Sequence, residues 1–410
     1  MKKKLKALAL IFAIVVSLFA INYFYMINHN PFLNEDTKVV NTDKISSQKL
    51  FEKTWQTIRN EYYDSDFNHQ QWYRWKLRYQ NKIKTDDDAK VAIETMLASL
   101  NDPYSRFMTK DEFAQQNNSI TSKISGIGVN IINNAGKIVI LNVIDETPAQ
   151  FADLRAGDII LAVNDKKVSG LSLSDVSTLV KGPVNTFVTL DILRGNEKLT
   201  KQIIRKEITI KTVKSSNDKD IGYIQISSFI SNYTPNEFLE ALENTSKAKG
   251  LIIDLRGNTG GLLTNAIFIA NLFIEKGRLV SIVGRNGYKY DIEAQETNVN
   301  INKPIVLLVD GASASASEIL SGAMKDYKKA KLIGTKTYGK GMVQKIIPMP
   351  NETGLNLTIA KYLTPKGNDI NKKGITPDIE VKITQKDILK KKDVQLETAK
   401  LMLNDIIANN

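Results

Sequence analysis

Serine and lysine residues with the spacing of a hydrolase active site lie in one stretch of this 410-residue chain, from Ile305 to Gln344. The stretch reads IVLLVDGASASASEILSGAMKDYKKAKLIGTKTYGKGMVQ. The apolar run Ile305–Asp310 predicts a buried strand, GASASAS follows it, and Glu318–Tyr327 has apolar residues at helical spacing. A serine placed where a strand gives way to a helix is exposed beside unpaired backbone N–H groups, which can stabilise an oxyanion.

A serine hydroxyl is a weak nucleophile without a base, and the candidate base here is Lys340 in the glycine-flanked loop TKTYGKG. Lysine acts as a base only when neutral, and burial can lower its pKa by about 3–5 pH units. Gln344 can orient the amine without adding a charge that favours the ammonium form. The chain has no cysteine, and its two histidines, His29 and His69, lie far upstream, so a Ser-His-Asp triad is not expected.

The residues alone leave two questions open. Ser313, Ser315 and Ser317 are equivalent candidates for the nucleophile. Ser-Ala repeats are also common at helix starts, and Gly-Lys-Gly occurs in many loops, so a purely structural stretch is the alternative to an active site.

GASASASEI followed by GTKTYGKGMVQ resembles the active-site pattern of the carboxy-terminal processing peptidases, also called tail-specific proteases. The resemblance implies a serine endopeptidase in which Ser315 is the nucleophile, Lys340 the general base and Gln344 the supporting residue. It extends over roughly Lys49 to Val381. DPYS, DLRGNTGG and GITPDIEV occur in the order of the family.

The DLRGNTGG segment follows a predicted buried strand, Gly250–Leu255, and opens a helix. A strand, a glycine loop and a helix form an anion-binding arrangement, but the loop lacks the lysine and the spacing of a nucleotide P-loop. The resemblance implies that the amide of Gly261 contributes to an oxyanion hole, together with the amide of Ala316. A tight turn without a ligand is the alternative.

Between Ser119 and Arg205, strand-like runs alternate with turn dipeptides around a short amphipathic helix. This segment resembles a PDZ domain. Gly126, Ile127, Gly128 and Val129 match the carboxylate-binding loop, and LRAGDII matches the LxxGDxI signature. Such domains bind peptide ends, because backbone N–H groups converge on the terminal carboxylate while a strand edge pairs with the peptide.

The expected fold class is α/β, a mixed-sheet serine protease core with an inserted PDZ domain and an N-terminal helical segment. The expected order is a signal-anchor or transmembrane segment (1–30), a linker (31–42), an N-terminal helical region (43–118), a PDZ domain (119–205), the protease core (206–381) and a charged helical C-terminal segment (382–410). In the helical region, Trp72, Tyr73 and Trp75 fit either a core or a docking surface for a second subunit.

MKKKLK precedes an apolar run from Ala7 to about Ile27 that is long enough to span a bilayer. The lysines put the N-terminus inside. This pattern predicts a single-pass cell-membrane protein whose bulk is extracytoplasmic, and a cleaved signal peptide is the alternative. The formal net charge is +12, without an arginine-rich or aromatic-interleaved block, so no nucleic acid partner is expected. With no cysteine and two histidines, no metal and no cofactor are expected.

Together these features predict an enzyme that captures unstructured, nonpolar C-terminal tails of proteins and cleaves them with a Ser-Lys dyad, with a homodimer as a further expectation. Two competing functions have distinct signatures. A membrane-tethered PDZ adaptor would leave Ser315 unreactive. A signal-peptidase-like enzyme would cleave one defined site independently of residues 119–205.

Overall fold

The computed structural model describes residues 41–409 apart from 121–122, 210, 298 and 300. These residues form two compact units. The inserted unit is Asn118–Lys211, and the core unit comprises the described residues from 41 to 117 and from 212 to 409. The predicted α/β class, with mixed sheets, an inserted domain and N-terminal helices, is confirmed.

A largely parallel sheet runs through the core unit. Its strands, in order across the sheet, are β10 (Val213–Asp218), β11 (Ile221–Ile226), β12 (Gly250–Asp254), β15 (Ile305–Val309), β16 (Lys331–Gly334) and β19 (Ile379–Glu380). Only β10 is antiparallel to its neighbour. The carboxyl ends of β12 and β15 therefore meet at one edge, where both candidate active-site loops begin.

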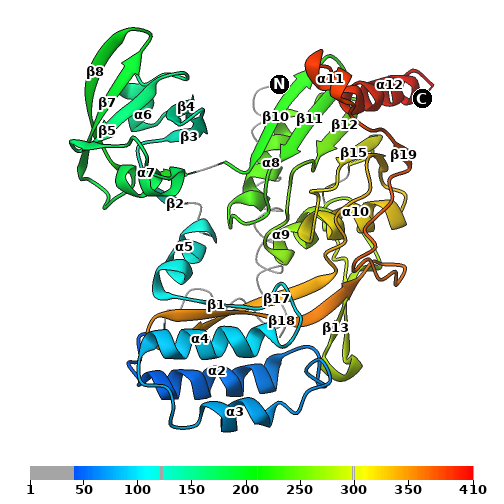
Figure 1. Cartoon of the computed structure of the whole chain (residues 1–410). Helices are drawn as coiled ribbons and strands as arrows, with labels where there is room; N and C mark the ends of the chain where they lie inside the picture. Colours follow the sequence, from blue (N-terminus) through cyan, green and yellow to red (C-terminus); the bar gives the residue numbers. More distant parts are fainter. Residues whose placement is uncertain (1–40, 121–122, 210, 298, 300, 410) are drawn as a thin grey trace, which may run out of the picture. The chain divides into compact units, whose positions relative to one another are not determined.

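Helices cover both faces of this sheet (Figure 1). One face packs against α8 (Thr234–Asn244), α9 (Leu263–Asn271) and α10 (Ala316–Asp326), and the other against α12 (Val394–Ala408), which follows α11 (Gln385–Leu389). Alternate residues of a strand point to opposite faces. Val306 and Leu308 accordingly pack with Leu403 of α12, whereas Leu307 lies in the main core. Continuous apolar runs such as IVLLV are what a strand buried on both faces requires.

A second, antiparallel sheet supports the lysine loop. It contains β1 (Arg106–Met108), β18 (Thr353–Leu363), β13 (Arg278–Gly284) and β14 (Lys289–Glu293), with β17 (Met342–Met349) also paired to β18 and a 3-10 turn at Arg285–Gly287. Figure 1 shows the N-terminal helices beside this sheet. They are α2 (Ser47–Glu61), α3 (Tyr73–Tyr79), α4 (Asp86–Ala98) and α5 (Lys110–Ile120).

The aromatic residues of the N-terminal region divide between core and surface. Trp72 and Trp75 are buried, and the indole N–H of Trp55 donates to the Trp72 carbonyl at 3.1 Å. Tyr73 is 56% exposed. The core reading therefore holds for the two tryptophans, and the homodimer stays a prediction that a single chain does not test.

The inserted unit is a small β-rich domain. Its main sheet has the order β3 (Val129–Asn134), β4 (Lys137–Val143), β5 (Ile159–Val163), β7 (Phe187–Arg194) and β8 (Glu197–Ile204), and β6 (Lys166–Lys167) pairs with β5. A separate ribbon joins β2 (Lys123–Gly126) to β9 (Lys206–Thr209). The helices are α6 (Pro148–Phe151) and α7 (Leu173–Val180), and β7 and β8 form a hairpin that turns between Arg194 and Glu197.

The predicted single-pass membrane localisation is corrected. Across residues 41–409, with the gaps noted, no helix combines the length and the apolar character needed to cross a bilayer, so this localisation is not supported. The anchor was placed on residues 1–30 and the linker on 31–42, and of these only 41 and 42 belong to the described residues.

Candidate active site

The candidate nucleophile lies at a strained turn between strand and helix. β15 ends at Val309, α10 begins at Ala316, and Ser315 joins them with φ 56° and ψ −114°. A positive φ is unusual for a residue with a Cβ, and such strain clusters at functional sites. The turn places Ser315 at the N-terminus of α10, where backbone N–H groups lack helical partners.

The structure distinguishes the three serines that the sequence left equivalent. Ser313 and Ser317 are fully buried, and their hydroxyls donate to the backbone carbonyls of Leu255 at 2.8 Å and Asn258 at 2.9 Å. Ser315 is only partly buried, and among the described residues its hydroxyl donates no hydrogen bond. Ser313 and Ser317 thus tie the turn to the neighbouring glycine loop, while the Ser315 hydroxyl is left available.

A fully buried carboxylate, that of Glu318, joins the serine turn to the lysine loop. One of its oxygens, Oε2, accepts the backbone N–H of Ser315 at 3.0 Å and that of Lys340 at 2.9 Å. The other, Oε1, accepts the Thr337 hydroxyl at 2.6 Å and the Gly339 N–H at 2.7 Å. Because one oxygen holds both amides, the backbone nitrogens of Ser315 and Lys340 lie within about 6 Å of each other.

A second bridge comes from the buried phenol of Tyr362 on β18. Its hydroxyl lies 2.8 Å from the Lys340 carbonyl and 3.1 Å from the Ser315 carbonyl, so it can donate to either. Complete burial raises the pKa of Tyr362 well above its ordinary value, which keeps the phenol a donor. Residues 315 and 340 are therefore held together through both their N–H and their C=O groups.

Burial changes the acid–base chemistry of Lys340. Desolvation lowers the pKa of Lys340 below its ordinary value of 10.5, although the charges of Asp102 and Glu318 act to raise it. The amine lies over the aromatic ring of Tyr104, 4.9 Å from its centroid. A lysine with a depressed pKa in an enclosed site is what a general base requires.

Gln344 lies on β17, four residues after the lysine. Its amide nitrogen approaches the Thr358 hydroxyl at 3.3 Å, which leaves its carbonyl oxygen free to accept from an amine. Within the described residues, no hydrogen bond joins the Lys340 amine to the Ser315 hydroxyl or to Gln344. The structure thus brings the backbones of Ser315 and Lys340 together, and it places Gln344 on the strand that follows the lysine loop.

The glycine loop after β12 packs against the serine turn. The Ala314 N–H donates to the Asn258 carbonyl at 3.0 Å. A Cβ on Gly260, whose φ is +103°, would lie 2.8 Å from the Cβ of Ser315, so only glycine fits. In the described part of the chain, the N–H groups of Gly261 and Ala316 donate no hydrogen bond. Both predicted oxyanion donors therefore have no hydrogen-bond acceptor among the described residues. Gly260, which sequence reasoning did not single out, is the glycine of this loop that packs against Ser315.

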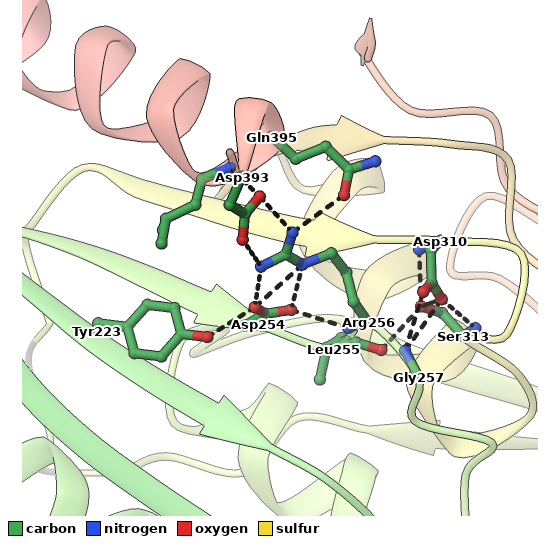
Figure 2. A network of polar contacts seen from close by, with 10 residues as sticks. Tyr223, Asp254, Leu255, Arg256, Gly257, Asp310, Ser313, Asp393 and Gln395 are labelled. Carbon is green, nitrogen blue, oxygen red and sulfur yellow. Dashed lines mark hydrogen bonds and ion pairs between the residues drawn. The ribbon is translucent and has the colours of Figure 1, made fainter. Parts of the chain in front are cut away.

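Arg256 connects the start of this loop to the C-terminal helix (Figure 2). Its guanidinium donates to Asp254 at 2.6 Å, to both oxygens of Asp393 at 2.8 Å, and to Gln395 at 3.1 Å. Asp254 is buried and also accepts the Tyr223 hydroxyl at 2.7 Å. The Asp254–Arg256 ion pair is thus part of a larger network that fixes the glycine loop relative to α12.

Figure 2 also shows how Asp310 anchors the two loops to each other. Its carboxylate accepts the Gly257 N–H at 3.1 Å and the Ala312 and Ser313 N–H groups at 3.0 Å. One carboxylate at the end of β15 therefore organises both the glycine loop and the serine turn.

The predicted peptide-binding loop opens the inserted unit. Ile127 is buried and Gly128 has φ +92°, where a Cβ would lie 2.3 Å from the Thr147 side chain. The carbonyls of Ile127 and Gly128 accept hydrogen bonds from the N–H groups of Ala149 and Ile144, beyond β4, but in the described residues their own N–H groups donate none. Val129 begins β3, which is an edge strand. Gly126 pairs within the β2–β9 ribbon instead.

Sequence reasoning missed Glu318, Tyr362 and Tyr104. A local signal existed for Glu318, because Ser315-x-x-Glu318 has the spacing of a capping box, in which the carboxylate reaches back to the N-cap amide. No local signal existed for Tyr362, and although Tyr104 lies in the DPYS segment that the resemblance includes, nothing there indicates its contact with Lys340, which lies far away in the sequence.

Comparison with known proteins agrees with these two units. Residues 220–381 match peptidase family S41, and residues 125–204 match a PDZ domain. A carboxyl-terminal-processing protease of Synechocystis is 34% identical over 88% of this chain and 88% of its own length. A carboxy-terminal-processing protease of Bartonella bacilliformis is 38% identical over 78% of this chain and 76% of its own length.

Among solved structures, the photosystem II D1 C-terminal processing protease is similar with a TM-score of 0.56 and 31% identity, covering 82% of this chain and 94% of that one. The inserted unit is therefore a PDZ domain, as its sequence predicted. By its extended similarity to these relatives, the chain belongs to the carboxyl-terminal-processing proteases of peptidase family S41, which are serine peptidases.

Proposed function

We propose that this serine protease cleaves protein chains with a Ser315–Lys340 dyad after its PDZ domain has bound their unstructured, nonpolar C-terminal tails. The observation that carries the proposal is the double tether of the serine turn to the lysine loop, through Glu318 and Tyr362. Rigid placement of a nucleophile beside a base converts an unfavourable encounter into an intramolecular step.

In the proposed reaction, Ser315 Oγ attacks the carbonyl carbon of the scissile peptide, and the neutral amine of Lys340 takes the hydroxyl proton. The carbonyl oxygen becomes an oxyanion, which the free N–H groups of Gly261 and Ala316 stabilise. Lys340 then returns the proton to the departing amine. Water attacks the acyl-enzyme in the same way and releases the second product, which regenerates the serine.

Gln344 has the chemistry to orient the base. Its amide nitrogen is engaged by Thr358, so its carbonyl oxygen is the end that can accept an N–H from the Lys340 amine. A neutral acceptor aims the lysine lone pair without stabilising the ammonium by charge. A carboxylate at this position would raise the pKa of the lysine and weaken the base.

Tail recognition is supported by the PDZ domain. The unpaired N–H groups of Ile127 and Gly128 can receive a terminal carboxylate, and the free edge of β3 can add a peptide strand. The side chains of Val129 and Ile131 on β3, and of Leu179 on α7, are apolar and only partly buried. Such side chains suit an apolar tail and disfavour an acidic one.

The test uses the full chain and an unfolded protein substrate that ends in small apolar residues, with products identified by mass spectrometry. A second substrate ends in aspartates. Cleavage should disappear in Ser315→Ala and Lys340→Ala and should weaken for the acidic tail. Cleavage that survives in Ser315→Ala would contradict the assigned nucleophile, and cleavage that ignores the tail would contradict recognition by the PDZ domain.

A matched pair of PDZ variants separates tail binding from general damage. Ile131→Asp places a charge on the edge strand β3, whereas Leu141→Asp places one on the neighbouring strand β4, at a side chain already 55% exposed. The first should reduce cleavage of the apolar-tailed substrate, and the second should not. Equal effects would contradict a role for the β3 edge.

A further inference from the structure

The turn Asp102-Pro103-Tyr104-Ser105 follows α4 in sequence and reaches the catalytic lysine in space. It lies more than 230 residues before Lys340, yet the Tyr104 ring is the surface on which the lysine amine rests, 4.9 Å from the ring centroid. A side chain of the N-terminal helical region therefore contacts the candidate base.

The turn is fixed to the sheet that carries the rest of the site. Asn356 on β18 donates its side-chain N–H to the Tyr104 carbonyl at 3.0 Å. The hydroxyl of Ser105 accepts the Thr358 N–H at 3.0 Å and donates to Asp102 at 2.6 Å. Immediately afterwards β1 pairs with β18. Because Thr358 is also the partner of Gln344, the ring and the glutamine share one support.

From this geometry we infer that Tyr104 is a positioning residue for Lys340. The tyrosine ring holds the lysine amine in place and tunes its basicity. The inference deepens the proposed Ser-Lys mechanism and rests on it. The ring acts in two opposite ways. Its electron-rich face attracts the ammonium form, while its bulk keeps water away from the amine and so favours the neutral form.

The groups that face the amine come from several elements. Asp102 lies in the same turn as Tyr104, and Glu318 lies on α10. Tyr338, in the lysine loop, is hydrogen-bonded to Tyr104. Both carboxylates favour the ammonium form, but desolvation outweighs them, so the pKa of Lys340 stays below its ordinary value. Removing the ring should therefore shift the pKa of Lys340 in opposite directions, depending on whether water takes the place of the ring.

Two substitutions separate the two actions of the ring. Tyr104→Leu keeps most of the apolar bulk but removes the attraction to the ammonium, so the titration of the lysine should move to lower pH by about 0.5 pH unit. Tyr104→Ala admits water, so the titration should move to higher pH. Tyr104→Phe keeps the ring and should leave the titration in place.

The measurement is the rate at which a fluorophosphonate modifies Ser315 in the full-length chain, followed by intact mass between pH 6 and pH 10. Attack on phosphorus expels fluoride while the base takes the serine proton, so the midpoint of the rate profile reports the neutral lysine. Tyr73→Leu, which removes an exposed tyrosine of α3, is the matched control. Far-ultraviolet circular dichroism verifies that each variant is folded.

Opposite displacements of the midpoint in the leucine and alanine variants, with the wild-type midpoint in the phenylalanine variant, would support the inference. Superimposable midpoints in all Tyr104 variants would overturn it, even if their rates fell together. If the alanine variant does not fold, an unmoved midpoint in the leucine variant is sufficient to overturn it. Failure of the underlying mechanism looks different, because Ser315 would then be unmodified in the wild type, or Lys340→Ala would keep the wild-type profile.

Discussion

Replacing Glu318 with glutamine would keep the shape of the side chain but turn one of its two acceptor oxygens into an NH2 donor. In the native chain both oxygens accept two hydrogen bonds each, from Ser315 and Lys340 on one side and from Thr337 and Gly339 on the other. Three of these four donors are backbone N–H groups, which cannot reverse their direction.

The magnitude follows from counting the donors that lose their partner. If the NH2 group faces Ser315 and Lys340, both backbone N–H groups are left unpaired. If it faces the other side, the Thr337 hydroxyl can rotate and accept, but the Gly339 N–H still loses its acceptor. Hydrogen bonds to a charged group contribute about 1.5–3 kcal/mol each, so Glu318→Gln should reduce the free energy of unfolding of the core unit by about 2–5 kcal/mol.

Urea unfolding followed by tryptophan fluorescence measures this loss in the core unit alone. All three tryptophans of the chain, Trp55, Trp72 and Trp75, belong to that unit. The same sample reports on the active site through the rate of fluorophosphonate modification. Because the carboxylate aligns the serine turn with the lysine loop, this rate should fall by about 100-fold.

A matched control is Glu237→Gln on α8. That carboxylate accepts three hydrogen bonds, from the Thr212 N–H and hydroxyl and the Val213 N–H, but it contacts neither active-site loop. All three donors reach the same oxygen, so the carbonyl oxygen of glutamine can keep them paired, and this variant should lose little stability and keep the modification rate. A Glu318→Gln variant that unfolds at the wild-type urea concentration and reacts at the wild-type rate would refute the reasoning.

Further predictions concern the base, the glycine loop and the PDZ domain. Burial holds the pKa of Lys340 below 10.5, and only the neutral amine is a base, so the acylation rate should rise with pH to a midpoint below 10.5; a rate independent of pH would contradict this. Gly260→Ala should lower the modification rate of the serine by about 100-fold, because the added Cβ would meet the serine turn. Gly257→Ala, whose added Cβ would have no atom within 4 Å, should lower the rate far less. Equal losses of rate would argue against a role for the contact between Gly260 and Ser315. Arg194→Ala leaves the buried carboxylate of Asp158 without its two charged hydrogen bonds and should destabilise the PDZ domain by about 3–5 kcal/mol, measured by hydrogen exchange; unchanged exchange there would exclude the ion pair as a support.

Local sequence predicted where the candidate site lies. An apolar strand, a small-residue turn and an amphipathic helix place a serine turn after Asp310, because each element depends on residues close together in the chain, but they left Ser313, Ser315 and Ser317 equivalent, and only the family resemblance assigned the nucleophile to Ser315. Lys340 between two glycines and Gln344 four residues later were identified in the same way. The structure brings the backbones of Ser315 and Lys340 together. It shows no hydrogen bond among the side chains of Ser315, Lys340 and Gln344 in the described residues.

The contacts that could not be predicted are those between distant segments. Tyr104 and Lys340 approach each other only because β1 and β17 both pair with β18, and strand pairing leaves no mark in either local sequence. Arg256 lies two residues after Asp254, but its other carboxylate partner, Asp393, follows 137 residues later. Gly260 and Gly261 are adjacent glycines, and only the fold shows that the first packs against the serine.

The central claim, a Ser315 nucleophile activated by Lys340, is tested most directly by locating a fluorophosphonate adduct with peptide mapping. The wild-type chain should carry one adduct, on Ser315, and Ser315→Ala should carry none. Lys340→Ala should react far more slowly while remaining folded. An adduct on Ser313 or Ser317, or an undiminished rate in Lys340→Ala, would contradict the account.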